Sequence, residues 1–400
     1  MSGPLAGTRV VELGFWVAGP AAAGIMADWG AEVVKIEPPA GDPMRGMFHS
    51  AAGVDVPINP PFELDNRGKR SIALNLMTEE GRVIARALLE RADVFVTNLR
   101  PAALQRMGLD FERVQSAHPR LVYCAVSGYG DTGPDRERPA YDIGAFWSRA
   151  AIGASLRPHD GEPPQQRGGM GDHTTAIAAV SAVCAALLAR ERTGKGQLVS
   201  TSLLRTGTYV LGWDVSIRLR FGKLEPPYDR FGIPNPMVNC YRSSDGRWFW
   251  LLGLQGDRHW PDVVRAIGRP ELLGDERFAD IRARRKNNAE CVRVLDAEFN
   301  TRPMTYWQDV FDRENVWWAP VQTVDELIAD PQARAAGTFV AAPTADGSAE
   351  MVASPADFAG TPWAPAGMPP EFGQHTEEIL LELGYDWERI AALKESGAIG

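Results

Sequence analysis

One aspartate in this sequence lies where a carboxylate could perform covalent chemistry. The segment 168–175 reads Gly-Gly-Met-Gly-Asp-His-Thr-Thr and precedes a long run of small residues, which predicts a packed helix reaching about Arg192. Asp172 in this segment suits the N-cap of that helix, because a short polar side chain accepts the first free backbone N–H groups. It equally suits a nucleophile, since a helix N-terminus favours an ionised carboxylate and flanking glycines let a substrate approach. The residues alone leave both roles open.

The N-terminal third must supply the scaffold for such a site. Its apolar runs alternate between the periods of strands and helices, starting with a β-α-β unit, and this alternation predicts an α/β fold with a parallel sheet covered on both faces. The predicted strands are Arg9–Leu13, Glu32–Ile36, Ser71–Leu76, Val94–Thr97 and Leu121–Ser127, and the predicted helices are Pro20–Trp29 and Thr78–Arg91.

The first β-α-β unit also raises the question of a dinucleotide site, because Glu37 ends the second strand about where a ribose-binding carboxylate would lie. The turn from Gly14 to Gly19 reads Gly-Phe-Trp-Val-Ala-Gly and lacks the G-x-G-x-x-G spacing. Trp16 would also obstruct the close backbone approach that a pyrophosphate needs. We therefore expect no NAD.

A second domain is indicated after the Pro-rich stretch 225–236, where the pattern changes, and a chain of 400 residues has room for two or three domains. We expect a large domain over 1–224, a smaller α+β domain over 225–330 and a C-terminal part over 331–400. The predicted hairpins are Met237–Leu254, turning at Ser243–Gly246, and Thr338–Ser354, and the predicted helices are Asp257–Ile267, Asn287–Asn300, Met304–Asn315, Thr376–Leu383 and Trp387–Glu395.

Composition and charge exclude several classes of function. A net charge of −9 argues against nucleic acid or an anionic membrane as partner. The longest nearly apolar stretch, 176–189, is interrupted by Ser181 and is shorter than a membrane span, and Arg9 and Glu12 stand where a signal peptide would be apolar. The four cysteines and six histidines show no metal-ligand spacing, so we expect reduced thiols, no metal and a cytoplasmic protein.

The segment Gly171–Asp172, its small-residue helix and the sequence Arg-Thr-Gly-Lys-Gly-Gln at 192–197 resemble the family III CoA-transferases, the carnitine and formyl-CoA transferase group. Single matches of this kind are weak, but their shared order over nearly the whole chain is specific. The other matches are 4–7 (Pro-Leu-Ala-Gly), 18–20 (Ala-Gly-Pro), 30–39 with 41–43 and Arg45, 69–72 (Lys-Arg-Ser-Ile), 98–101, 106–108 (Arg-Met-Gly), 128–130 (Gly-Tyr-Gly) and 375–378 (His-Thr-Glu-Glu).

This resemblance implies a Rossmann-like sheet that binds CoA in the large domain, a chain end that returns to it after the small domain, and two chains interlocked as a homodimer. It implies Asp172 as the nucleophile, with the turn of Trp16, Val17 and Ala18 beside the thioester. The side chains implied to line the CoA site are Leu74, Met77, Asn98, Leu99, Arg100, Ala103 and Arg106, with Tyr141 and Asp142 near the pantetheine end.

The activity implied is transfer of CoA from an acyl-CoA to a small free carboxylic acid. Arg100 and Arg106 would supply positive charge for the phosphates of CoA, although a solvated helix face explains them equally well. Two alternatives remain: an α-methylacyl-CoA racemase and a non-catalytic CoA-binding protein. Against the racemase, Tyr141 stands where racemases of this family place a catalytic histidine, and Gln255 where one type has a glutamate.

The sequence also departs from the family pattern at several positions. Some members carry Arg where Pro38 stands, Lys where Met77 stands and Gln where Val17 stands. No clear counterpart of the glycine-rich loop of formyl-CoA transferase occurs between Glu225 and Tyr241. The identities of the acyl donor and of the acceptor acid therefore do not follow from the resemblance.

Overall fold

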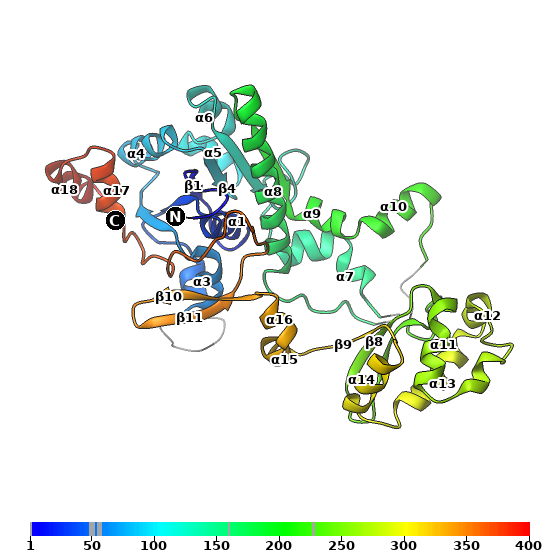
Figure 1. Ribbon diagram of the computed structural model, residues 1–400. Coiled ribbons are helices and arrows are strands. Elements are labelled where there is room, and N and C mark those ends of the chain that lie inside the picture. Colours follow the sequence, from blue (N-terminus) through cyan, green and yellow to red (C-terminus); the bar gives the residue numbers. More distant parts are fainter. Residues whose placement is uncertain (1, 48–52, 54–57, 159–160, 226–228) are drawn as a thin grey trace. The chain divides into compact units, whose positions relative to one another are not determined.

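The computed structural model describes residues 2–47, 53, 58–158, 161–225 and 229–400 (Figure 1). The chain forms two compact units. The first comprises residues 1–154, 165–224 and 335–400, and the second comprises residues 155–164 and 225–334. The first unit therefore collects both ends of the chain, and the second is built mainly from one continuous segment.

A six-stranded parallel sheet is the centre of the first unit. Its strand order is β3-β2-β1-β4-β5-β6, and every neighbouring pair is parallel. This is the order of a doubly wound Rossmann-type sheet, in which the direction of strand addition across the sheet reverses between β1 and β4. The predicted parallel α/β sheet is confirmed, while β6 was missed. The strands are β1 Arg9–Leu13, β2 Glu32–Glu37, β3 Arg70–Ala73, β4 Val94–Thr97, β5 Val122–Ser127 and β6 Leu198–Ser202.

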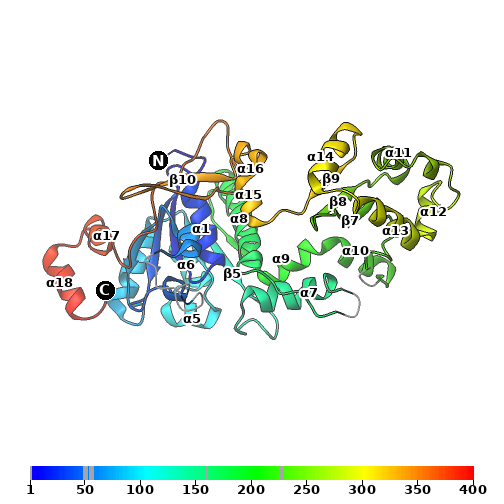
Figure 2. The ribbon, with the colours of Figure 1, turned by 90° about the horizontal axis from the view of Figure 1, so that it is seen from below.

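Helices cover both faces of the sheet because successive strand residues point to opposite sides. Val10 packs with α1 and α8 on one face, and Val11 packs with α4, α5, α6, α17 and α18 on the other. Figure 2 shows α8 on one side of the sheet and α17 and α18 on the other. The helices of this unit are α1 Ala18–Asp28, α3 Pro60–Asn66, α4 Glu79–Glu90, α5 Pro101–Met107, α6 Phe111–Ala117, a π-helical turn Ile143–Arg149, α7 Ile152–Ser155, α8 Met170–Thr193, α9 Leu203–Val210, α10 Gly212–Phe221, α17 Thr376–Glu382 and α18 Trp387–Glu395.

Helix α8 is long and apolar enough, by length and composition, to cross a membrane. Its small buried residues, among them Ala176, Ala179 and Val183, instead form a core with α1 and the sheet. Helix α1 begins at Ala18, two residues before the predicted start, so Pro20 lies in the first turn, where its missing N–H costs no helical hydrogen bond. The apolar composition of both helices thus reflects close packing inside this unit.

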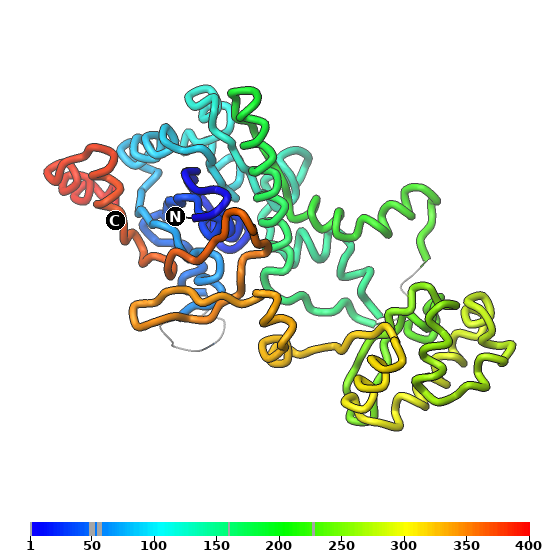
Figure 3. Tube along the Cα trace, in the orientation of Figure 1, coloured from blue at the N-terminus to red at the C-terminus, as the bar shows by residue number. Residues whose placement is uncertain are grey.

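The C-terminal chain, drawn from orange to red in Figure 3, runs back along the N-terminal half of this unit. The predicted hairpin is confirmed as strands β10 Phe339–Thr344 and β11 Gly347–Val352. Further on, His375 N–H donates to the Ser71 carbonyl at 2.9 Å, and Leu74 forms an antiparallel bridge with Ile399. The last residues therefore pair directly with β3 and the chain that follows it.

The second unit has its own aromatic core around a small antiparallel sheet. Tyr241, Phe249 and Phe299 meet there at ring distances of 5.1–6.2 Å. The predicted hairpin of 237–254 and the three predicted helices after it are confirmed. The elements are β7 Val238–Arg242, β8 Trp248–Leu252, β9 Trp318–Pro320, α11 Gly256–Ala266, a 3-10 turn Pro270–Leu273, α12 Ile281–Lys286, α13 Asn288–Phe299, α14 Met304–Arg313, α15 Val324–Ala329 and α16 Pro331–Ala335.

Candidate active site

A cavity of about 360 Å³ opens at the carboxyl ends of β1, β4 and β5, the edge of the sheet where doubly wound folds bind their ligands. Asp172 lies in its wall. The cavity also contains seven of the residues assigned to the CoA site from the resemblance: Trp16, Ala18, Asn98, Leu99, Arg100, Ala103 and Tyr141. The fold thus brings residues from five separate segments of the chain around one carboxylate.

Asp172 does not cap helix α8, and the N-cap interpretation was wrong. The N-cap is Gly169, whose φ of 79° suits glycine, and Asp172 lies two positions inside the helix, in its first turn. Gly171 before it packs so tightly that an added Cβ would lie 2.5 Å from the Phe146 ring. In the part of the chain that the structure describes, the Asp172 carboxylate accepts no hydrogen bond, so it is free to face the cavity.

The sequence predicts that the helix N-terminus keeps Asp172 ionised, but the structure favours its protonated form more than expected. Burial, followed by the nearby Asp142 carboxylate, raises the pKa of Asp172 to about 7. The helix N-terminus favours the ionised form, but loss of water around the carboxylate outweighs that effect. A carboxylate with this pKa changes charge near neutral pH, which is common at functional sites.

A partly buried histidine–carboxylate pair lies beside this carboxylate. His173 Nε2 is 3.0 Å from Oδ1 of Asp65, whose side chain is 3% exposed. Burial alone would lower the pKa of His173, but the hydrogen bond and charge of Asp65 raise it above its usual 6.5. The charge of His173 in turn lowers the pKa of Asp172 and opposes Asp142 and Asp65. The sequence analysis missed this pair, because no local spacing links residues 65 and 173.

The turn after β1 forms another wall of the cavity. Trp16 has a φ of 69°, a left-handed conformation that is uncommon for a bulky residue. Its ring meets the Tyr141 ring edge to face at 5.6 Å. Asn98 holds the preceding residue by accepting from Phe15 N–H at 3.0 Å and donating to the Phe15 carbonyl at 2.7 Å. The side chain of Asn98, which follows β4, thus binds the backbone that follows β1, at the point where the order of strand addition reverses.

Other assigned residues lie away from the cavity lining. Val17 packs partly on the core around α1 and α8, and Asp142 accepts a hydrogen bond from Gln166 at 3.0 Å. Leu74 is fully buried, whereas the side chain of Met77 is 72% exposed. Leu74 therefore presents no side-chain surface to a ligand.

Arg106 lines a separate cavity of about 500 Å³ on helices α4, α5 and α6. This arginine-rich cavity also holds Arg82, Arg86, Arg113 and His118. Arg82 and Arg86 share one carboxylate, Glu79, and Arg113 pairs with Asp110. Among the described residues no carboxylate forms an ion pair with Arg106, so its guanidinium is available to an anion.

The first cavity contains further residues that the sequence analysis did not select. Arg136 and Arg138 line it together with Ser127, the last residue of β5, and Gly128, which follows it. An added Cβ on Gly128 would lie 2.3 Å from Ala140, so glycine lets the 136–141 segment close over the end of β5. The position of these residues just after a predicted parallel strand was the signal that could have identified them.

Comparison with known proteins agrees with this geometry. Residues 5–376 match the family model "CoA-transferase family III". The chain is 32% identical over 400 residues to an (R)-2-hydroxy-4-methylpentanoate CoA-transferase of Clostridioides difficile, covering 99% of each chain. It is 32% identical to a cinnamoyl-CoA:phenyllactate CoA-transferase of Clostridium sporogenes, covering 97% of this chain and 95% of that one. It also resembles the crystal structure of a CaiB/BaiF family protein from Brucella suis, with a TM-score of 0.84, 31% identity, and 96% and 100% of the two chains covered.

A doubly wound sheet with a carboxylate cavity at its carboxyl edge defines the class as an α/β enzyme. The family match over nearly the whole chain makes it specific: the protein belongs to the CoA-transferase family III. The resemblance derived from the ordered sequence motifs is therefore confirmed.

Proposed function

We propose that this enzyme moves CoA from an acyl-CoA to a free carboxylic acid and that Asp172 is its nucleophile. The main support for this proposal is the position of the Asp172 carboxylate in the wall of the cavity at the carboxyl edge of the sheet, together with its pKa of about 7. At that pKa a substantial fraction is ionised at neutral pH, and an ionised carboxylate can attack a thioester carbonyl. Both curated relatives described above are CoA-transferases.

The reaction conserves the thioester bond energy. An oxygen of Asp172 attacks the acyl carbonyl of the donor, which forms a mixed anhydride and releases CoA thiolate. The thiolate then attacks the aspartyl carbonyl, giving an aspartyl-CoA thioester and the free donor acid. The acceptor carboxylate attacks this thioester and forms a second anhydride and thiolate. Attack of that thiolate on the acceptor acyl carbonyl yields the new acyl-CoA and restores Asp172.

The residues assigned from the resemblance would contact different parts of the acyl-CoA. Trp16, Val17 and Ala18 would lie beside the thioester, and Tyr141 and Asp142 near the pantetheine end. The guanidinium of Arg100 would contribute positive charge for the phosphates, with Arg106 at the arginine-rich cavity. The remaining CoA contacts proposed from the resemblance involve Met77, Asn98, Leu99 and Ala103, whereas the buried side chain of Leu74 is no longer proposed to contact CoA.

We further propose a cytoplasmic homodimer with interlocked chains. Helix α10 has no buried residue in the described chain, and it carries large apolar side chains that would be costly to leave in water. The most exposed of these and of the preceding helix are Tyr209, Trp213, Leu219 and Phe221, which are 75–86% exposed. A second copy of the chain would cover this face. All four cysteines are free thiols, as expected for the cytoplasm.

An exchange assay with Asp172→Ala tests the proposal. The variant should fold and lose transferase activity by several powers of ten, because it lacks the covalent nucleophile. Mass spectrometry of the wild type incubated with acyl-CoA should show an adduct on Asp172. Asp309→Ala, at an exposed carboxylate of the second unit, is the control and should keep full activity. Near-normal turnover by Asp172→Ala would end the proposal.

A further inference from the structure

The turn that contains Trp16 contacts a buried cluster of charged side chains that have no role in the proposed reaction. Glu12, Lys35 and Lys69 lie in this cluster, and each of these side chains is 0% exposed. Both Glu12 oxygens form ion pairs of 2.7 Å, Oε1 with Lys35 and Oε2 with Lys69. Buried charges are costly unless they are paired, so their presence beside the cavity calls for an explanation.

Both lysines also donate to backbone carbonyls, one at the start of the turn and one in the first turn of helix α1. Lys35 Nζ lies 2.8 Å from the Gly14 carbonyl, and Lys69 Nζ lies 2.8 Å from the Pro20 carbonyl. Burial lowers the pKa of Lys69 to about 8, whereas the charges of Glu12 and Asp42 outweigh burial and raise the pKa of Lys35. Lys35 is thus the firmly charged member, and it carries the contact to the start of the turn.

Asp42 completes the cluster and contacts Trp16 itself. Its Oδ1 accepts from the backbone N–H of Trp16 at 3.1 Å and of Met44 at 2.9 Å, and its Oδ2 pairs with Lys35 at 2.9 Å. Asp42 is therefore the one side chain in the described part of the chain that accepts a hydrogen bond from the Trp16 N–H. A bulky residue persists in the left-handed region only when its surroundings determine its conformation, and such strain concentrates at active sites.

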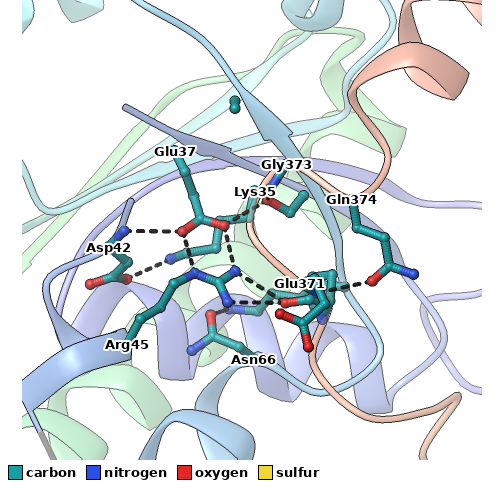
Figure 4. Close-up of polar contacts among 12 residues, drawn as sticks. Lys35, Glu37, Asp42, Arg45, Asn66, Glu371, Gly373 and Gln374 are labelled. Carbon is teal, nitrogen blue, oxygen red and sulfur yellow. Dashed lines mark hydrogen bonds and ion pairs between the residues drawn. The ribbon is translucent and has the colours of Figure 1, made fainter. Parts of the chain in front are cut away.

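The loop that carries Asp42 is itself fixed from two directions (Figure 4). Glu37 accepts from Asp42 N–H at 3.0 Å and forms a bidentate pair with Arg45 at 2.7 and 2.8 Å. Arg45 also donates to the carbonyl of Pro370, and Ser71 donates to Glu37 at 2.6 Å. Asp42 therefore has little freedom to move away from Trp16.

From this arrangement we infer that Asp42 is a positioning residue for CoA transfer, acting through Trp16. Its carboxylate holds the Phe15–Trp16 turn in the left-handed conformation that places the Trp16 ring in the wall of the Asp172 cavity, at the edge of Tyr141. The inference rests on the proposed function, because it takes that cavity as the place where the thioester reacts. Misplacement of a wall beside a reacting group costs rate even when binding persists.

A double-mutant cycle of Asp42→Ala and Trp16→Ala tests the inference. Each single variant should lower kcat at least tenfold, and KM for the acyl-CoA should change less. The double variant should be no slower than the slower single variant, because the two residues act as one unit. Effects on kcat that multiply in the double variant, or a normal kcat in folded Asp42→Ala, would overturn the inference.

Asp42→Asn separates positioning from stability. The amide keeps an oxygen for the Trp16 N–H but loses the ion pair with Lys35, so Tm should fall while kcat stays within threefold of the wild type. The same variant keeps the test decisive should Asp42→Ala fail to fold. A tenfold loss of kcat in folded Asp42→Asn would contradict the role of that hydrogen bond.

The control is Asp28→Asn, at another buried carboxylate of the same unit. Asp28 pairs with Arg67 at 2.6 Å, away from the cavity lining. This variant should lose stability but keep kcat. Hydrogen exchange of residues 14–17 should speed up in Asp42→Ala and not in Asp28→Asn, and equal exchange in both would also contradict the inference. This readout is independent of Asp172, so an active Asp172→Ala would refute the nucleophile without deciding the role of Asp42.

Discussion

His173 Nε2 lies 3.0 Å from the Asp65 carboxylate, and this imidazole directly follows Asp172 in the chain. Burial raises the pKa of Asp65, while its hydrogen bond to His173 acts in the opposite direction. The charge of His173 therefore lies next to a carboxylate whose other surroundings, burial, Asp142 and Asp65, disfavour ionisation. We propose that His173 widens the pH range in which Asp172 is an effective nucleophile.

The first prediction is that His173→Gln moves the acid limb of the kcat/KM profile to higher pH by about half to one pH unit. The amide can still bind Asp65 but carries no charge, so the pKa of Asp172 rises and less of it is ionised at pH 7. Activity should recover at pH 9. His375→Gln, at a histidine that lines neither the Asp172 cavity nor the arginine-rich cavity, should leave the profile unchanged. An equal loss at every pH would indicate a structural role for His173 instead.

The second prediction concerns stability. Asp172 has a pKa of about 7 when folded and 3.8 ordinarily, so the folded chain binds more protons between these values and its stability falls as pH rises through them. At 1.36 kcal/mol per pKa unit the full effect is at most about 4 kcal/mol. Asp172→Asn should therefore stabilise the protein by about 1–3 kcal/mol at pH 8 and by much less at pH 4. Denaturant unfolding at the two pH values measures this, and a pH-independent difference would contradict it.

The sequence predicted the sheet well because its signals are local. Runs such as Val94–Thr97 are short, apolar and bounded by polar residues, and the strand they predict has the same bounds in the structure. The strand Leu198–Ser202 was missed, since its exposed and half-buried positions give no apolar run. Edge strands of this kind are defined by pairing with a neighbour, here β5, rather than by their own composition.

The candidate site was predicted less completely, and for a physical reason. Asp172 was identified from its glycine-rich segment, but its raised pKa depends on burial and on Asp142, neither of which is visible in local sequence. The same holds for Asp42, whose contact with Trp16 links two segments 26 residues apart. Contacts between separate segments exist only after folding, so sequence patterns alone do not reveal them.

The third prediction is that Arg106→Ala weakens CoA binding by about 1.5–3 kcal/mol, the usual value of a hydrogen bond to a charged group, with little effect on the fold. Arg106 has no ion-pair partner among the described residues and lies in the arginine-rich cavity, so it can bind a phosphate without losing an existing ion pair. Calorimetric titration with CoA measures the change. Arg192→Ala, an exposed arginine at the end of α8, is the matched control. Unchanged affinity in Arg106→Ala would remove this residue from the CoA site.

The fourth prediction is that dilution yields no folded monomer. Interlocked chains cannot separate without unfolding, and the exposed apolar side chains of α10, such as Trp213, would otherwise remain in water. Light scattering over a wide concentration range, together with circular dichroism, tests this. A folded monomer at low concentration would contradict interlocking. As a second test, Trp213→Asp places a charge on this apolar face and should reduce the yield of folded dimer.

The last prediction separates transfer from racemisation. A racemase needs an acid and a base on opposite sides of the α carbon. The Asp172 cavity instead contains Tyr141, which the resemblance assigns to the position of the racemase histidine, and a phenol is a poor base at neutral pH. The resemblance assigns Gln255 to the position of the racemase glutamate, and its amide cannot accept and return a proton in this way. Incubation of a chiral 2-methylacyl-CoA in deuterated water should give neither α-deuteration nor inversion, while CoA passes to an added acid.

The acceptor panel for this assay should contain 2-hydroxy acids, dicarboxylic acids and aromatic acids, so that acids of different size and charge are compared. Asp172→Ala in the same mixture shows whether any exchange depends on the proposed nucleophile. Rapid α-deuteration without transfer to any acid of the panel would reverse the assignment, since proton exchange requires only a base near the α carbon and transfer requires a covalent carrier of CoA. Transfer without deuteration would leave Asp172 as a nucleophile and exclude its use as one half of an acid/base pair.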